Sequence, residues 1–206
     1  MCVMQPRPKP QMPAAVICLA VFTSIAAFAQ APAERKAAQA VSPNASTTTG
    51  NATIIHAAEI NSAARMGAGL AVADSVLRVL PMKGNYNVGV SVVTRSKING
   101  KTPPDAIVHD VVTEVYSIIT GSGMLVVGGT LDSAERIPAS SPIVLKITGP
   151  SLRGTHITGG KQYPVGPGDI VVIPPNTPHG FIDLKTDQIV YTLVRIDPEK
   201  VLQVKQ

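Results

Sequence analysis

The chain has 206 residues, of which 45% are hydrophobic and 15% charged, with 17 glycines and 18 prolines. These values are typical of one globular domain with many turns, and they exclude a disordered chain, a coiled coil and a collagen-like repeat. The formal net charge of +5 includes Arg7 and Lys9 near the amino terminus, and the remaining basic residues form no cluster. Nucleic acid is therefore not expected as a partner.

Residues 1–29 have the features of a signal peptide. Arg7 and Lys9 precede an apolar stretch at 14–27, and small residues follow at the recognition positions before Gln30. The apolar stretch is shorter than the roughly 20 residues that span a membrane. We therefore expect cleavage before Gln30 and a periplasmic or secreted protein without membrane contact after cleavage, with an uncleaved anchor as the alternative.

The rest of the chain divides into two parts. Residues 30–52 are rich in Ala, Ser, Thr and Pro and have no hydrophobic period, which predicts a flexible linker. Both cysteines, Cys2 and Cys18, lie in the predicted signal, so the mature protein has no disulfide and no thiolate ligand or nucleophile. We expect one all-β domain over residues 53–206.

Short β-branched segments dominate this domain. An Ala-rich stretch from Thr53 to about Arg65 predicts one helix. Segments rich in Val, Ile, Thr and Tyr, each bounded by turn residues, predict the strands of an antiparallel sandwich or barrel. These strands are expected at 75–80, 86–94, 114–120, 124–127, 143–147, 170–173 and 188–195.

Two details of the strands bear on the interior. Residues 86–94 alternate, with Tyr86 and three valines on one face and Asn87, Gly89 and Ser91 on the other. Such alternation predicts that one face is buried against a second sheet. The Gly-Ser-Gly segment at 121–123 has no following Lys-Ser/Thr, so we interpret it as a hairpin turn rather than a phosphate loop.

Two motifs carry the candidate chemistry. The first begins at His109, continues after four residues with Glu114, and ends six residues later at Gly121. The second begins at Gly168, continues with Pro174 after five residues, and reaches His179 five positions further on.

In the order and spacing of these motifs the chain resembles the cupin superfamily. The resemblance implies a jelly-roll β-barrel, which the predicted short N-terminal helix precedes, and it implies that His109, Glu114 and His179 are metal ligands. Two imidazole nitrogens and one carboxylate oxygen suit a divalent ion, with Zn, Fe, Mn and Ni all compatible, and leave other coordination positions open. Pro174 and further prolines are expected to stiffen the loop that presents His179.

The chain departs from the family pattern at three positions. Cupins commonly have another histidine two residues before the one at 109, and this chain has Ile107 there. Asn176 stands where a glycine is usual, a mild change because Asn tolerates the left-handed conformation. Asp183 stands at an Asn-like position. His156 could replace the missing imidazole in space, although exposure to solvent is the simpler expectation.

Other polar residues are weaker candidates. Tyr116 should share a strand face with Glu114 and could hydrogen-bond a substrate, or it could pack in the core. Arg78 and Arg95 could recognise a carboxylate or lie on the sheet surface, and we take Arg95 as a candidate substrate contact. For His56 we expect a surface or helix-capping role. No residue is assigned as catalytic.

The sequence thus supports an exported cupin that binds a divalent metal and acts on a small molecule. The alternative is a cupin barrel that has lost the metal and only binds a small molecule. The resemblance is also compatible with a homodimer. Metal identity, substrate and reaction do not follow from fold-level similarity.

Overall fold

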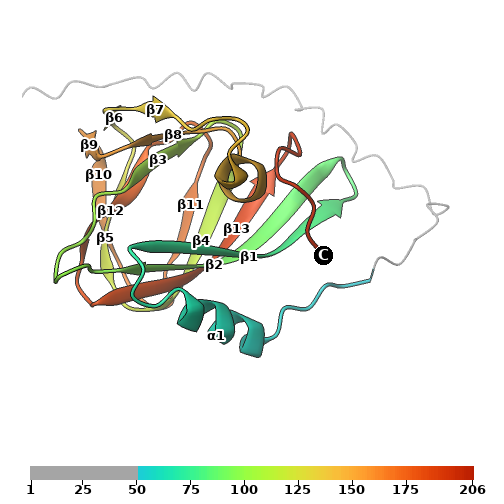
Figure 1. Cartoon of the computed structure of the whole chain (residues 1–206), viewed down its shortest axis with the longest axis horizontal. Helices are drawn as coiled ribbons and strands as arrows, with labels where there is room; N and C mark the ends of the chain where they lie inside the picture. Colours follow the sequence, from blue (N-terminus) through green and yellow to red (C-terminus); the bar gives the residue numbers. More distant parts are fainter. Residues whose placement is uncertain (1–50) are drawn as a thin grey trace, which may run out of the picture. The chain divides into compact units, whose positions relative to one another are not determined.

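The computed structural model describes residues 51–206 (Figure 1). The predicted signal peptide (1–29) and the predicted linker up to residue 50 lie outside the described residues. Among the described residues no helix is long and apolar enough to cross a membrane. One α-helix, α1 (Ala57–Met66), precedes a series of mainly antiparallel strands.

The strands of residues 51–206 form two large sheets and one small one. The five-stranded sheet contains, in spatial order, β1 (Val72–Met82), β2 (Tyr86–Ser96), β13 (Gln188–Asp197), β4 (Thr113–Thr120) and β11 (Ile170–Ile173). The six-stranded sheet contains β10 (Lys161–Val165), β5 (Gly123–Val127), β12 (His179–Leu184), β3 (Ala106–His109), β8 (Ser151–Gly154) and β7 (Glu135–Arg136). The small sheet pairs β6 (Thr130–Asp132) with β9 (His156–Thr158).

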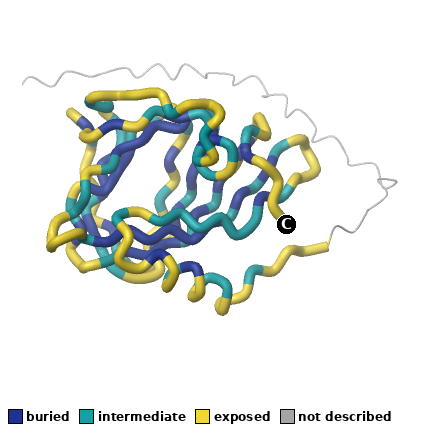
Figure 2. The backbone as a smooth tube through the Cα atoms, in the orientation of Figure 1, coloured by how far each residue is buried: buried dark blue, intermediate teal, exposed yellow. Residues whose placement is uncertain are grey.

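The two large sheets pack face to face as a jelly-roll barrel, as predicted (Figure 1). Strands adjacent in space are mostly distant in sequence, since β13 lies between β2 and β4 and β12 lies between β3 and β5. Figure 2 shows that buried backbone is concentrated in the strands, while α1 and the loops carry most of the exposed residues. This topology brings motifs from separate parts of the chain into one interior.

The face of the five-stranded sheet that points into the barrel is partly polar. On β2 the face that carries Asn87, Gly89 and Ser91 is buried, whereas Val88 and Val90 are only half-buried. The outward valine face receives part of its cover from α1, because Val92 packs against the helix. The polar face therefore points into the barrel, where charged side chains need hydrogen-bonding partners.

Helix α1 begins at Ala57, four residues later than the sequence predicts. The carboxylate of Glu59 accepts the backbone N–H of His56 at the helix start and pairs with Arg78 at 3.0 Å. Ala63 is buried against Val92, since a small side chain allows the helix to approach the sheet closely. Arg78 is therefore a helix contact and does not line the cavity described below.

The predicted strand at 143–147 is wrong. This segment forms a short π-helix, η1 (Val144–Thr148), preceded by a turn in which Ser141 Oγ accepts the Ile143 N–H and the Ser141 carbonyl accepts the Leu145 N–H. Gly149 ends it with φ +65° and donates its N–H to the Val144 carbonyl. These local hydrogen bonds override the β-propensity of Ile and Val, and π-helices often occur near functional sites.

The predicted hairpin at 121–123 is also wrong. The segment joins β4, in the five-stranded sheet, to β5, in the six-stranded sheet, so it is a crossover between sheets. Gly121 has φ +77°, and a Cβ there would lie 2.1 Å from the carbonyl oxygen of Gln188. Only glycine fits this position, which explains why the motif has a glycine here. The requirement for glycine does not depend on a pairing of β4 with β5.

Candidate metal centre

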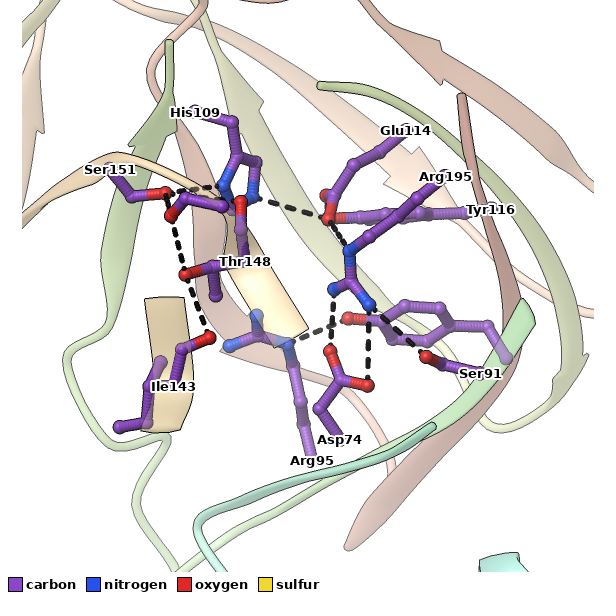
Figure 3. A network of polar contacts seen from close by, with 12 residues as sticks. Asp74, Ser91, Arg95, His109, Glu114, Tyr116, Ile143, Thr148, Ser151 and Arg195 are labelled. Atoms are coloured by element: carbon purple, nitrogen blue, oxygen red, sulfur yellow. Dashed lines mark hydrogen bonds and ion pairs between the residues drawn. The ribbon is translucent and has the colours of Figure 1, made fainter. Parts of the chain in front are cut away.

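The three predicted ligands meet in the barrel interior. His109 ends β3 and His179 begins β12, both in the six-stranded sheet, while Glu114 lies on β4 in the opposing sheet. All three are buried and line one cavity, and Figure 3 shows the His109 imidazole directed towards the Glu114 carboxylate. The ligand atoms of His109, Glu114 and His179 all lie within 4.8 Å of one another.

The distances bring both imidazoles to the same carboxylate. His109 Nε2 lies 3.2 Å from Glu114 Oε1, and His179 Nε2 lies 3.2 Å from Glu114 Oε2. The two imidazole centroids are 5.3 Å apart. One ion between these atoms could therefore contact two nitrogens and one oxygen, a donor set suited to divalent transition metals.

The hydrogen bonds assign the tautomer of His179. Its Nδ1 lies 2.9 Å from the carbonyl oxygen of Thr177. A carbonyl only accepts, so Nδ1 carries the proton and Nε2 presents its lone pair to the cavity. Within the described residues Nε2 is buried and has no hydrogen-bond donor. This orphaned nitrogen, facing a carboxylate, needs a cation or a second proton to satisfy it.

The tautomer of His109 is assigned in the same way. Its Nδ1 lies 2.9 Å from Ser151 Oγ, and that hydroxyl lies 2.9 Å from the carbonyl of Gly149. The Ser151 hydroxyl donates its single proton to the carbonyl of Gly149, so its oxygen accepts the Nδ1–H of His109. His109 Nε2 therefore also presents a lone pair. Such a partner for the distal nitrogen is typical of ligating histidines. Two lone pairs and a carboxylate thus converge at one point.

Glu114 is held ionised in this setting. Tyr116 donates to Oε2 and Arg195 Nε donates to Oε1, each at 2.9 Å. Burial alone would raise the pKa of the Glu114 carboxyl, but the attraction of His109 and Arg195 and the hydrogen bonds hold it well below its usual value. Each oxygen keeps a lone pair beyond these bonds, so the carboxylate remains able to bind a cation.

Arg195 is a buried residue that the motifs do not reveal. Its Nη2 pairs with Asp74 at 2.5 Å and its Nη1 donates to Ser91 at 3.1 Å (Figure 3). Burial would lower the pKa of Arg195, but Asp74 and Glu114 raise it, so the guanidinium stays charged. The alternation of Tyr191, Leu193 and Arg195 on one face of a strand is the sequence signal that would have placed this arginine inside.

Ile107 lies where a fourth ligand would be expected. It occupies the same face of β3 as His109, lines the cavity, and pairs in register with His179. His156 does not replace it, because His156 is exposed on β9 and lies outside the cavity lining. The chain therefore brings three candidate ligands together and leaves an apolar wall at the fourth position.

The loops around the centre fix the two histidines relative to each other. Asn176 adopts φ +56°, the left-handed conformation that an asparagine tolerates in place of glycine. Its N–H donates to the carbonyl of His109 at 2.7 Å, and Gly128 donates to the carbonyl of Pro178 at 2.8 Å. The second motif is thus tied by backbone bonds to the first motif and to β5.

Both predicted substrate contacts line the same cavity of about 180 Å³. Tyr116 is buried and uses its proton on Glu114; burial and the Glu114 charge raise the pKa of Tyr116 well above its usual value. Arg95 is buried beside Tyr191. Their roles toward a substrate stay predictions.

Comparisons with known proteins found one family profile and several solved structures. The profile of the AraC-like ligand binding domain matches residues 153–206. No curated protein sequence matches the chain. The solved structures with similar folds include a Photorhabdus luminescens protein (17% identity, 64% of this chain and 80% of that chain, TM-score 0.37). A double-stranded β-helix protein of Klebsiella pneumoniae is 14% identical, with 73% of this chain and 94% of that chain covered and a TM-score of 0.39.

Oxalate oxidase in complex with the substrate analogue glycolate is also similar, at 22% identity and a TM-score of 0.36. The alignment covers 63% of this chain and 52% of that one, so this chain spans about half of the oxidase. The profile match, which spans residues 153–206, and the two-sheet barrel confirm the predicted cupin-type fold.

Proposed function

We propose that this barrel binds one divalent metal ion through His109 Nε2, Glu114 and His179 Nε2, and that it acts on a small molecule in the adjoining cavity. The observation that carries the proposal is the convergence of three electron-pair donors in a buried place, with the imidazole tautomers fixed by Ser151 and Thr177. Without a cation, the lone pairs of two nitrogens would face a carboxylate in a low-dielectric interior, which is unfavourable.

The protein's own contribution is to hold the donors rigidly. A divalent ion held there supplies Lewis acidity for polarising a substrate oxygen. Arg195 and Tyr116 each donate to one oxygen of Glu114 and so fix its orientation. The apolar side chains Ile107 and Leu193 on the cavity wall limit water around the site, which strengthens its electrostatic interactions.

Metal content tests the proposal directly. The full chain, purified without chelator, should hold about one divalent ion per molecule by elemental analysis, and His109→Ala and His179→Ala should hold much less. His156→Ala is the matched control, because it removes an exposed imidazole outside the cavity. Circular dichroism should establish that each variant is folded. A wild-type chain with no more metal than the His109 and His179 variants defeats the proposal.

The second candidate is a metal-free barrel that only binds a small molecule. It is favoured by the ion pair between Arg195 and Glu114 at 2.9 Å, because Arg195 already compensates part of the carboxylate charge. In that case the imidazole sites would take up protons rather than metal. The same metal analysis separates the two candidates.

The proposed activity takes place after export. The basic residues and apolar stretch of residues 1–29 support cleavage before Gln30 and a periplasmic or secreted location. The test is the N-terminal sequence of protein recovered from outside the cytoplasm. An N-terminus at Met1 would contradict this part of the proposal.

A further inference from the structure

A second polar group lines the same cavity as the metal centre. Arg95, on β2, is buried, and its Nε donates to the hydroxyl oxygen of Tyr191 at 3.0 Å. Its Nη1 pairs with Asp105 at 2.6 Å, and its guanidinium lies 5.5 Å from the centroid of the Phe181 ring. Three contacts in different directions fix the guanidinium plane, so it is a preorganised group rather than a mobile surface charge.

This group retains donors that the protein does not use. Within residues 51–206 Arg95 Nη2 makes no hydrogen bond, and the Tyr191 hydroxyl accepts from Arg95 but donates its own proton to no acceptor. Burial raises the pKa of the Tyr191 hydroxyl, although Arg95 acts against this, so Tyr191 keeps its proton. Arg95 and Tyr191 therefore offer two adjacent N–H and O–H donors on the cavity wall.

Aromatic rings connect these donors to the metal centre. Tyr191 stacks on Tyr116 with 4.5 Å between ring centroids, and Tyr116 meets His179 edge-on at 6.3 Å. Arg95, Tyr191, Tyr116 and the three candidate ligands all line the same cavity. A small molecule in the cavity can therefore reach the Arg95 donors and the open side of the metal centre together.

The charges of the lining indicate the sign of the ligand. Three guanidinium groups and three carboxyl groups balance one another, and an imidazole that keeps its proton on Nδ1 and binds a metal ion through Nε2 adds no charge. The charged residues are Arg95, Arg153, Arg195, Asp74, Asp105 and Glu114. A divalent ion would leave the lining with an excess of two positive charges, or of one if the exposed Arg153 is left out, and an excess of this sign favours an anion.

We propose that the cavity binds a small carboxylate anion, with one carboxylate on Arg95 and Tyr191 and another oxygen of the same molecule directed to the metal centre. This inference rests on the proposed function and names its substrate class. The cavity volume of about 180 Å³ is below the roughly 300–1,000 Å³ of sites for drug-sized ligands, so the anion has only a few carbon atoms. Apolar walls at Ile107, Ile143 and Ile147 contact its carbon atoms.

Malonate and malonamide form the test pair, because they share size and shape but only malonate is charged. The full chain is loaded with Co²⁺, whose visible absorption reports changes in its ligands, and each compound is titrated in while calorimetry measures the dissociation constant. We expect malonate to change the spectrum and to bind at least about tenfold more tightly than malonamide. Gel filtration must show that the Co²⁺ stays with the protein during the titration.

Variants assign the binding to the named residues. Arg95→Gln should weaken malonate binding at least about tenfold with unchanged Co²⁺ content, and Arg95→Lys should restore part of it. Tyr191→Phe keeps the ring and should weaken binding severalfold, which preserves the test if Arg95→Gln fails to fold. Arg65→Gln removes an exposed guanidinium of α1 and should change nothing.

The outcomes separate the two proposals. If Co²⁺ binds but malonate and malonamide bind alike, or if Arg95→Gln binds malonate like the wild type, the carboxylate inference is overturned. If no Co²⁺ binds, the proposed function fails. The role of Arg95 is then measured by malonate binding to the metal-free chain, where equal binding by wild type and Arg95→Gln overturns it as well.

Discussion

The two ends of the barrel interior are built from the same strands but from different chemistry. At one end Ile118, Leu125, Ile173, Leu184 and Ile189 pack into an apolar core, and each is at most 3% exposed. This packed end contrasts with the cavity end, where the same faces of the strands carry acids, arginines and histidines (Figure 3).

The change from apolar to charged side chains occurs along single strands, at every second residue. Along β4 the inward positions run from Glu114 through Tyr116 to Ile118, and along β13 they run from Arg195 to Tyr191. The stacked rings of Tyr116 and Tyr191 thus form the layer between core and cavity. A single sheet can therefore hold a stabilising core and a chemical site, because side chains two residues apart share a face.

Arg195→Met should produce the largest loss of stability and would break the charge balance of the cavity end. It leaves the buried Glu114 and the half-buried Asp74 without their cation, and we expect the free energy of unfolding in metal-free protein to fall by about 3–5 kcal/mol. Urea unfolding measures this loss. A bound metal ion should reduce it, because the ion supplies positive charge to Glu114.

The combined variant Arg195→Met with Glu114→Gln is the control for this prediction. It should recover part of the lost stability, since the uncompensated carboxylate is removed with its partner. If Arg195→Met alone is as stable as the wild type, the ion pair does not hold the cavity end together.

Leu125→Ala tests the packed end. Leu125 is completely buried, so the substitution should cost about 2–5 kcal/mol in free energy of unfolding. Leu125 is absent from the cavity lining, and metal content should therefore stay at the wild-type level. Loss of metal from a folded Leu125→Ala protein would show that the two ends are coupled.

Ile107→His should strengthen metal binding at the cavity end, because it adds the imidazole that the family pattern has at this position. Since residue 107 lines the cavity beside His109 and His179, the proposed metal ligands, we expect metal affinity to rise on the order of tenfold, which corresponds to about 1.4 kcal/mol. Competition with a coloured chelator measures the change. Ile107→Leu is the control and should leave affinity unchanged, whereas equal affinity of Ile107→His would place the metal elsewhere.

Arg78→Gln should have the smallest effect, because its partner Glu59 lies outside the barrel. A backbone hydrogen bond from His56, and secondarily Arg78, lowers the pKa of the Glu59 carboxyl in the folded state. The stabilisation is thus present above the usual value of 4.5 and is lost as pH falls below it. The difference in urea midpoint between wild type and Arg78→Gln should be slight at neutral pH and should vanish on acidification. A difference that grows at low pH would contradict this origin.

The sequence was most informative where spacing and chemistry coincide. The motif spacing brought out His109, Glu114 and His179, which the structure gathers at one point. Alternation and β-branched residues predicted the long strands β2 and β13 closely, because these strands have a strong period of two.

The remaining features depend on contacts that no local pattern reports. Segment 143–147 has strand-forming residues, but within residues 51–206 it pairs with no strand, and hydrogen bonds that Ser141 accepts from Ile143 and Leu145 favour η1 instead. Arg195 and Asp74 are far apart in sequence and meet only through the pairing of β1 and β13 with β2. Sequence alone gives no reason to join this arginine to Glu114.

The backbone bond from Asn176 to the carbonyl of His109 has a consequence for the speed of ion capture. This bond joins the segment that carries His109 to the segment that carries His179. The proposed metal site therefore has its shape before an ion binds. Little chain entropy is then spent on ordering the ligands at the moment of capture. Uptake should accordingly be limited by entry into the barrel rather than by assembly of the ligands.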